Sequence, residues 1–226
     1  MKICFINPPF KAEFGKFSRE SRSPAITKSG ALYYPLWLIY AAAYCEKVGY
    51  DICFLDAPAK QMNEEQSLDF VKQNAGDAKL FVFGTSTPSI KSDVAFASEI
   101  KNLCPSAFML LVGTHPSARP EETLGYSSAI DAVAIGEYDN IVLELANAIK
   151  DGTDIAQVRG LCINGADGCK RTALMPAMKE LDEIPFASEF IHKYLDPRDY
   201  FFAAATCLAI SSPKSSLFFS RPSPMM

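Results

Sequence analysis

Four short apolar runs in this sequence each lead into a polar loop that contains glycine or proline. One run, Leu110–Val112, stops at Gly113, and a loop with Pro116 and Pro120 follows. The other runs are residues 3–6, 80–83 and 132–135, which lead into Asn-Pro-Pro, Gly-Thr-Ser-Thr-Pro and Gly-Glu-Tyr. Short apolar runs suit strands that are buried on both faces of a parallel sheet. Because the carboxyl ends of parallel strands meet at one edge, the four loops predict a single shared crevice.

Helical patterns separate these runs. Pro35 is placed to begin a helix that continues to Val48, with Leu36, Ile39, Ala43 and Val48 facing the sheet. Further helices are expected over residues 64–74, 90–103 and 140–150, with a short helical turn at 120–122 and one more strand at 51–55. The alternation predicts a doubly wound α/β domain over residues 1–150, built on a mainly parallel, five-stranded, flavodoxin-like sheet. The long loop 11–34 is expected to cover a site.

Three further segments follow this domain. Residues 151–179 carry strand-like runs around an Asp-Gly turn, which predicts a β-hairpin that extends one edge of the sheet. Residues 180–206 are expected to form an extended connector with a short helix, since they contain charge and proline where a core element would not. Residues 207–226 are rich in Ser, Pro and Phe without periodicity, which predicts a disordered tail.

Composition and charge argue against several classes of protein. The chain has 226 residues, of which 49% are hydrophobic, so it can bury a full core. Its net charge of -4 supplies no basic excess, and nucleic acid is not expected as a partner. The longest apolar run, Tyr33–Cys45, falls short of the about 20 residues that span a bilayer. We therefore expect no membrane association.

The cysteines and the first residues indicate where the protein resides. Seven cysteines without a Cys-x-x-Cys pair indicate neither a disulfide framework nor a zinc site. The apolar run after Met1-Lys2 is too short for a signal peptide. Both observations favour a cytoplasmic protein.

The motifs of several common sites are missing. Asn7-Pro8-Pro9-Phe10 stands where a dinucleotide-binding sheet would have Gly-x-Gly-x-x-Gly, and the chain has neither a Walker loop nor Gly-x-Ser-x-Gly. Gly84 ends the third expected strand, where a phosphoacceptor domain would have aspartate. Nicotinamide, hydrolase and phosphorelay functions are disfavoured.

The loop motifs, in their order, resemble the cobalamin-binding domain of cobalamin-dependent radical S-adenosylmethionine enzymes. They are Asn7-Pro8-Pro9, Tyr34-Pro35-Leu36, Gly84-Thr85-Ser86-Thr87-Pro88-Ser89, Gly113-Thr114-His115-Pro116-Ser117 with Pro120-Glu121-Glu122, and Gly136-Glu137-Tyr138. Asp182-Glu183-Ile184-Pro185-Phe186 is similar to the segment that joins this domain to the radical barrel. The resemblance spans about residues 1–200, and it implies a small-molecule corrinoid as the partner.

The resemblance also implies which residues contact the corrinoid. The predicted set is Asn7, Pro8, Pro9, Phe10, Tyr34, Pro35, Leu36, Thr85, Ser86, Thr87, Pro88, Gly113, Thr114, His115, Pro116, Gly136, Glu137 and Tyr138. Ser86 or Thr87 matches the hydroxyl residue that lets the nucleotide tail pass between strands, and Gly113 matches the glycine that the tail approaches. A simpler reading stays open, in which residues 85–87 only cap the next helix.

The resemblance makes a specific prediction about cobalt. The Asp-x-His-x-x-Gly motif, through which many corrinoid proteins ligate cobalt, is absent after the first strand. Cobalamin is therefore expected with its base displaced and with no protein histidine on the metal. His115 is expected to be a hydrogen-bonding partner, and Glu137 a polar contact for the corrin side chains. No catalytic residue is assigned.

One departure from the family bears on activity. The Cys-x-x-x-Cys-x-x-Cys motif that opens the radical barrel is missing, and only Cys207 precedes the Ser/Pro-rich tail. The sequence thus predicts a chain truncated or frameshifted before that barrel, which binds but does not catalyse. An iron–sulfur cluster, S-adenosylmethionine and radical methyl transfer are implied only for an intact relative. An α/β domain that binds another small molecule or a protein partner remains the alternative. The oligomeric state is left undetermined.

Overall fold

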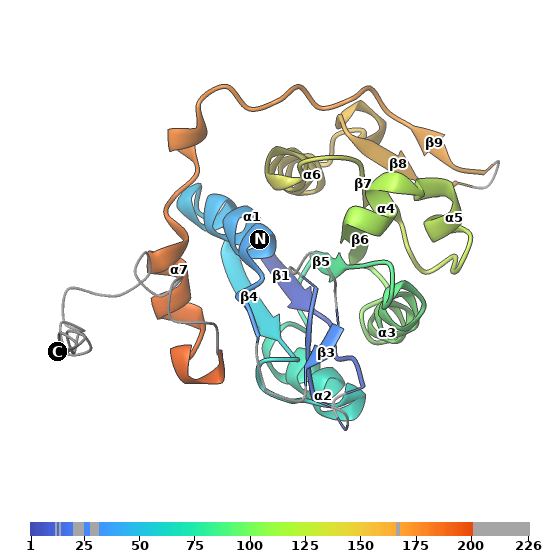
Figure 1. The fold of residues 1–226 in the computed structure, drawn as a ribbon. Coiled ribbons are helices and arrows are strands. Elements are labelled where there is room, and N and C mark those ends of the chain that lie inside the picture. Colours follow the sequence, from blue (N-terminus) through green and yellow to red (C-terminus); the bar gives the residue numbers. More distant parts are fainter. Residues whose placement is uncertain (12, 14, 20–24, 28–31, 166–167, 201–226) are drawn as a thin grey trace, which may run out of the picture.

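A twisted sheet with helices on both faces forms the body of the protein in the computed structural model (Figure 1). The structure describes residues 1–200 except 12, 14, 20–24, 28–31 and 166–167. The sheet has seven strands in the order β4-β1-β5-β6-β7-β8-β9. Their bounds are β1 Lys2–Asn7, β4 Asp51–Asp56, β5 Leu80–Thr85, β6 Phe108–Gly113, β7 Ala132–Ala134, β8 Leu161–Ile163 and β9 Lys170–Arg171.

The first five of these strands are parallel, as the sequence predicts. β8 pairs antiparallel with β7, and β9 pairs antiparallel with β8. The expected hairpin therefore extends the sheet at the edge beyond β7, and the sheet as a whole is mixed and seven-stranded rather than five-stranded. The mainly parallel α/β fold class is confirmed.

Helices cover both faces of the sheet. α1 (Leu36–Lys47) and α6 (Asp139–Asp151) lie on one face, while α2 (Glu64–Asn74) and α3 (Ile90–Leu103) lie on the other (Figure 1). The chain moves from β1 outward to β4, then returns past β1 to β5 and continues to β7. Since each crossover is right-handed, this reversal of direction places α1 and α3 on opposite faces.

The strand residues alternate between two cores. In β1, Ile3 and Phe5 pack beneath α1 and α6, whereas Cys4 and Ile6 pack beneath α2 and α3, and all four are fully buried. The expectation of strands buried on both faces is confirmed. Two short helices, α4 (Thr114–Ala118) and α5 (Pro120–Leu124), follow β6, where only a single helical turn was predicted.

Helix α1 differs from the expected pattern at two positions. Ile39 and Ala43 are buried as predicted, but Val48 lies beyond the last helical residue and is 51% exposed. Trp37, on the first turn, is 63% exposed. The apolar surface of α1 is therefore larger than the part that its neighbours cover.

The short helix expected in the connector is present, but the segment is packed on the domain rather than extended. It contains η3 (Leu181–Glu183), α7 (Ala187–Tyr194) and η4 (Pro197–Asp199). Phe190 and Ile191 are buried in the same core as α1, and the Phe190 ring meets Phe54 of β4 edge-on at 5.3 Å between centroids. The charged residues of α7 face solvent, and the helix uses its apolar face to cover the β4 edge of the sheet, which would otherwise offer unpaired backbone groups.

Loop 11–34 also contains structure that the sequence did not predict. β2 (Lys16–Ser18) and β3 (Ala25–Thr27) form a small antiparallel pair, and the Phe17 ring lies 4.4 Å from that of Phe10. A last 3-10 turn, η2 (Ile155–Gln157), follows α6. The predicted tail, residues 207–226, lies outside the described residues. Within the described part of the chain, no helix is both long and apolar enough to cross a membrane.

Candidate functional site

A cleft opens at the carboxyl edge of the sheet, between α1 and α6. Its volume is about 1110 Å³. The strand ends of β1, β5 and β6 and the loop after β7 form its floor, and residues 175–186 border one side. β1, β5, β6 and β7 are neighbours in the sheet, so the four polar loops do meet in one crevice, as the sequence predicts.

Eight of the predicted contact residues line this cleft. They are Asn7, Pro35, Thr85, Gly113, Thr114, Gly136, Glu137 and Tyr138. The other ten, Pro8, Pro9, Phe10, Tyr34, Leu36, Ser86, Thr87, Pro88, His115 and Pro116, do not. Asn7, Thr85 and Gly113 are the last residues of their strands, and Thr114 and residues 136–138 follow a strand by one to four positions. Distance from a strand end does not separate the two groups, because Pro8, Ser86 and His115 also lie within two residues of one.

Gly113 is required by the neighbouring strand. Its φ is +123°, and a Cβ built on it would lie 2.3 Å from the carbonyl oxygen of Thr85 on β5. Thr85 in turn donates its hydroxyl to the carbonyl of Val112 at 2.9 Å. The resemblance assigned this glycine to the approach of a ligand. The close contact between β5 and β6 by itself already requires a residue without a Cβ at this position. Gly136 differs. Its φ is also positive, at +91°, but a Cβ built on it would have no atom within 4 Å.

The hydroxyl residues after β5 have separate roles. Thr85 lines the cleft, Thr87 is exposed, and Ser86 is buried with its Oγ 2.9 Å from that of Ser89. Ser89, the residue before α3, makes no side-chain cap to the helix. Because the residue before α3 is Ser89, residues 85–87 do not occupy its N-cap; the Thr85 hydroxyl bonds to the neighbouring strand β6 and that of Ser86 to Ser89.

Asn7, the first residue of the Asn-Pro-Pro motif, joins the buried acid Asp56 to the Arg19 side chain. Its amide nitrogen donates to Asp56 at 2.8 Å, and its amide oxygen accepts from Arg19 at 2.8 Å. Asp56 also accepts from the Tyr200 hydroxyl at 2.7 Å. Burial raises the pKa of Asp56, and these hydrogen bonds oppose the rise. Asn7 thus fixes the end of β1 to the loop before α1 and to the end of the connector.

Arg19 extends the same network toward α3. Its guanidinium lies 2.5 Å from the carboxylate of Asp93, which also accepts from Ser89 at 2.6 Å, and both charged side chains are almost fully buried. Sequence reasoning missed this pair, although a signal was present. Asp93 falls on the inward face of the predicted helix between Ile90 and Ala97, and a buried acid requires a cation or several donors.

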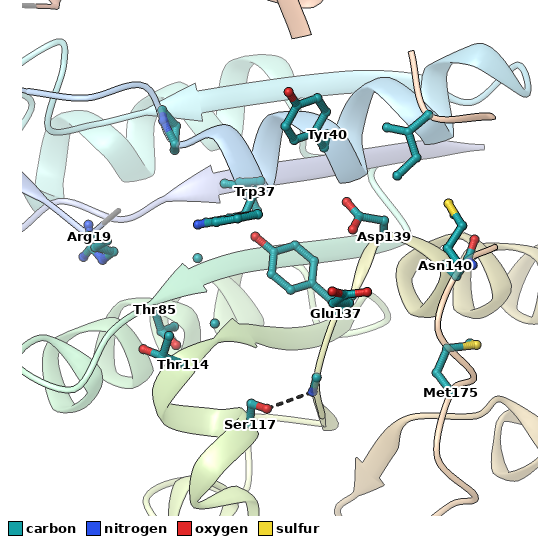
Figure 2. A pocket seen from close by; sticks show the side chains of 18 of the residues that line it. Arg19, Trp37, Tyr40, Thr85, Thr114, Ser117, Glu137, Asp139, Asn140 and Met175 are labelled. Atoms are coloured by element: carbon teal, nitrogen blue, oxygen red, sulfur yellow. Dashed lines mark hydrogen bonds between the residues drawn. The ribbon is translucent and has the colours of Figure 1, made fainter. Parts of the chain in front are cut away.

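The walls of the cleft contain further residues that the motifs did not indicate (Figure 2). Trp37 and Tyr40 come from the first two turns of α1, opposite Asp139 and Asn140 at the start of α6. Met175 approaches from the segment after β9. Ser117 accepts a hydrogen bond from the backbone of Gly136 at 2.8 Å, which ties the loop after β7 to α4. Trp37 could have been found from the sequence, because it is an aromatic residue on the first turn of the helix that begins at this edge of the sheet.

The cleft carries few positive charges. Arg19 is the cation in its lining, and it is paired with Asp93, whereas Glu137, Asp139 and Asp182 are acidic. The exposed rings of Trp37 and of Phe186, which is 84% exposed, add apolar surface at the rim. The cleft therefore suits a large, mostly neutral ligand better than a pyrophosphate.

His115 lies outside the cleft. It is buried in α4, and its Nε2 has no hydrogen-bond partner among the described residues. The second histidine, His192, is exposed on α7. Within the described residues, no group of three or more His, Cys, Asp or Glu side chains could hold a metal ion.

Comparison with known proteins identifies the family. The model of the B12 binding domain matches residues 22–146, more than half of the chain. The chain belongs to the B12-binding domain family. Among curated relatives, this B12-binding domain is 28% identical over 157 residues to an anaerobic magnesium-protoporphyrin IX monomethyl ester cyclase of Rubrivivax gelatinosus, covering 66% of this chain and 28% of the relative. It is 27% identical over 189 residues to an uncharacterized methyltransferase of Pyrococcus horikoshii, and the match covers 83% of this chain and 38% of the relative.

Solved structures share the fold. The radical S-adenosylmethionine methyltransferase TsrM from Kitasatospora setae superposes with a TM-score of 0.60 at 18% identity, over 76% of this chain and 30% of that one. The cobalamin-dependent S-adenosylmethionine radical enzyme OxsB, with aqua-cobalamin and S-adenosylmethionine bound, superposes with a TM-score of 0.63 at 13% identity. This match covers 84% of this chain and 25% of that one. The B12-binding domain described here is thus similar to that of cobalamin-dependent radical S-adenosylmethionine enzymes. It spans about a quarter to two fifths of the length of these relatives.

Proposed function

We propose that the domain binds cobalamin in the cleft between α1 and α6, with the nucleotide base displaced from cobalt. One observation carries this proposal: the family motifs of four separate loops contribute Asn7, Thr85, Gly113 and Glu137 to one cleft at the carboxyl edge of the sheet. Ligands of doubly wound sheets bind at this edge, beside the point where the strand order reverses. That point lies between β1 and β5.

The cleft fits a corrinoid in size and in charge. Its volume of about 1110 Å³ exceeds the roughly 300–1,000 Å³ of pockets for drug-sized ligands. Cobalamin carries many neutral amides and a single phosphodiester, which matches a lining with little positive charge. Bound cobalamin would supply a cobalt centre that can carry a methyl group.

The residues of the cleft divide the binding between them. Trp37 presents an exposed aromatic surface on which an apolar macrocycle can pack. Glu137 and Thr114 offer exposed polar groups to amide side chains. Gly84 and Gly113 leave the floor without side chains. Neither histidine lies in the lining, which supports a cobalt without a protein imidazole.

We further propose that the domain serves as the corrinoid-binding part of a radical S-adenosylmethionine enzyme of methyltransferase type. Its similarity to the methyltransferase of Pyrococcus horikoshii and to TsrM supports this assignment. The residues of the cleft hold and orient the cofactor, and the iron–sulfur cluster and S-adenosylmethionine would act outside the described residues.

Titration with hydroxocobalamin tests the proposal. We expect one equivalent to remain with the protein through gel filtration and the visible spectrum to change to that of a base-displaced corrinoid. After reduction to the cob(II)alamin complex, paramagnetic resonance should lack splitting from an axial nitrogen, and His115→Ala should leave the spectrum unchanged. Failure of hydroxocobalamin to co-elute at stoichiometric loading would refute cobalamin binding. Nitrogen splitting that disappears in His115→Ala would refute only the proposed ligation.

A further inference from the structure

Asp139 occupies an unusual position in the wall of the cleft. It is the first residue of α6, it lines the cleft, and it lies across from Tyr40 of α1 (Figure 2). One of its carboxyl oxygens, Oδ1, is buried and has no hydrogen-bond partner among the described residues. Buried polar atoms of folded proteins are almost always paired, so a carboxyl oxygen that lacks a partner in a ligand cleft points to a ligand group.

The surroundings of Asp139 disfavour its charge. Burial raises its pKa to about 6, and the nearby Glu137 adds to the rise, while the backbone amide of Asp139 opposes it. From α1, the neighbouring Cys45 thiol is buried and has its own pKa raised to about 12. Asp182, on the segment that borders the cleft, is another acid.

No cation is free to neutralise Asp139 among the residues that line the cleft. Arg19 is the basic residue of the lining, and its guanidinium is already committed to Asp93, Asn7 and the carbonyl of Pro8. Tyr40, from α1, contributes a neutral side chain. The pKa of Asp139 is therefore raised to about 6, and among the described residues that line the cleft no free basic side chain is available to share its proton.

We propose that the Asp139 carboxyl hydrogen-bonds the released nitrogen of the displaced nucleotide base and shares one proton with it. This inference rests on the proposed function and adds the residue that retains the base. A base that leaves cobalt exposes a nitrogen lone pair, which is a hydrogen-bond acceptor and a weak base. A protonated Asp139 donates to that nitrogen, and a carboxylate accepts from the protonated nitrogen. Both forms contain one proton and have no net charge, so the pair suits this poorly solvated site.

The proton balance gives the proposal a measurable consequence. Below about pH 6 free Asp139 already holds the proton, so binding takes up little from solvent. Above about pH 6 Asp139 is ionised in the free protein, and binding must take one proton from solvent. The affinity for cobalamin should then fall about tenfold for each pH unit above this point. Glu137 and Asp182, by contrast, are exposed, and water already solvates them.

The test compares two corrinoids at pH values from about 5.5 to 7.5. Hydroxocobalamin contains the nucleotide base, and aquacobinamide lacks it. The parent protein should bind hydroxocobalamin more weakly as the pH rises and take up about one proton per complex at pH 7.5, measured by calorimetry in two buffers of different ionisation enthalpy. Aquacobinamide should bind without proton uptake, because it offers no base to Asp139.

Two variants and a control complete the experiment. Asp139→Asn keeps a donor but cannot ionise, so its affinity for hydroxocobalamin should not depend on pH and its proton uptake should vanish. Asp139→Leu should lose about tenfold or more in affinity for hydroxocobalamin at pH 6 while retaining aquacobinamide. Glu144→Gln, which alters an exposed acid of α6 outside the cleft, should behave like the parent. Circular dichroism would verify that each variant is folded.

The possible failures are distinguishable. If the parent retains neither corrinoid, both the proposed function and this inference are wrong. If the parent binds both corrinoids, but Asp139→Asn keeps the pH dependence and proton uptake of the parent, cobalamin binding stands and the inference is overturned. Equal loss of aquacobinamide and hydroxocobalamin in Asp139→Leu would also overturn it, since the side chain would then support the cleft rather than the base.

Discussion

The two faces of the sheet are built from the same strands and yet differ in kind. On the face of α2 and α3, Phe81, Phe83 and Ile100 are fully buried, and beside the end of β1 the buried Arg19 pairs with Asp93 of α3. On the face of α1 and α6, the strand centres are equally buried, but a cleft opens at the strand ends, with Trp37 at its edge. Stability and binding are thus assigned to different parts of one fold.

The difference follows from the order of the strands. Because the chain reverses direction between β1 and β5, α1 and α3 leave the adjacent strand ends on opposite faces of the sheet. The edge between them is consequently left uncovered. Residues 175–186 pass beside α6 toward α1 and border the cleft without filling it (Figure 1). Substitutions on the two faces should therefore separate folding from cofactor binding.

The largest expected effect concerns two glycines at the floor of the cleft. Gly113→Ala should lower the free energy of unfolding by about 4 kcal/mol, because its Cβ would overlap the Thr85 carbonyl at a positive φ. Gly136→Ala is the matched control: its φ is also positive, but its Cβ meets open space, so the cost should be about 1 kcal/mol. Urea unfolding measures both. Equal losses would show that the approach of β5 to β6 is not the constraint.

The next effect tests the assignment of the two faces directly. Ile100→Ala, in the core beneath α3, should lower the free energy of unfolding by about 3 kcal/mol and leave cobalamin affinity unchanged. Trp37→Ala should lower cobalamin affinity and leave the free energy of unfolding nearly unchanged, because this side chain is mostly exposed at the cleft. We expect little change in urea unfolding and about a tenfold loss of hydroxocobalamin affinity. A Trp37 variant that unfolds easily but binds normally would contradict the division.

A comparable effect should appear in the pH dependence of stability. Asp139 has a native pKa of about 6 against an ordinary value of 3.8, so the native state binds more protons than the unfolded state between these values. Its contribution to stability is therefore largest below about pH 4, decreases as the pH rises to about 6 and is constant above that. Relative to Asp139→Asn, the parent should lose about 3 kcal/mol across this window. Parallel stability profiles for the two proteins would exclude the raised pKa.

The smallest effect concerns the docking of the connector. Tyr200→Phe removes the hydroxyl that donates to the buried Asp56, and should lower the free energy of unfolding by about 1 kcal/mol. The ring itself stays packed against Tyr34, at 4.1 Å between centroids. Limited proteolysis should then cut the segment after α7 more readily. If neither measurement changes, the end of the connector does not dock on β4 in solution.

Much of the fold could be predicted because the signals are local. The apolar runs gave the five parallel strands, and the predicted helix 64–74 coincides with α2 while 90–103 coincides with α3. Boundaries were recognisable from residues such as Pro35 before α1 and Gly152 after α6. The extra strands β2 and β3 escaped prediction because each is three residues long and has no alternating pattern of its own.

The candidate site could be predicted only in part, for a geometric reason. Asn7, Thr85 and Gly113 are the last residues of β1, β5 and β6, so the strands themselves bring them to the cleft, and Glu137 follows three residues after β7. The direction of a residue that follows a strand depends on the fold of the loop, and Ser86 and His115, one residue after β5 and two after β6, turn into the protein. No local pattern indicated that Arg19 would enter the network at β1.

The sequence by itself determined that strands buried on both faces would alternate with helices, and that their polar ends would share one edge. It also carried the motifs of the B12-binding family, since these depend on a few residues at fixed distances from each strand. Only the tertiary structure decided which side of that edge stays open, that α7 packs on β4, and that Asp139 lies in the cleft with one carboxyl oxygen unpaired among the described residues. These features join residues far apart in the chain, and such contacts depend on how whole elements pack rather than on neighbours in sequence.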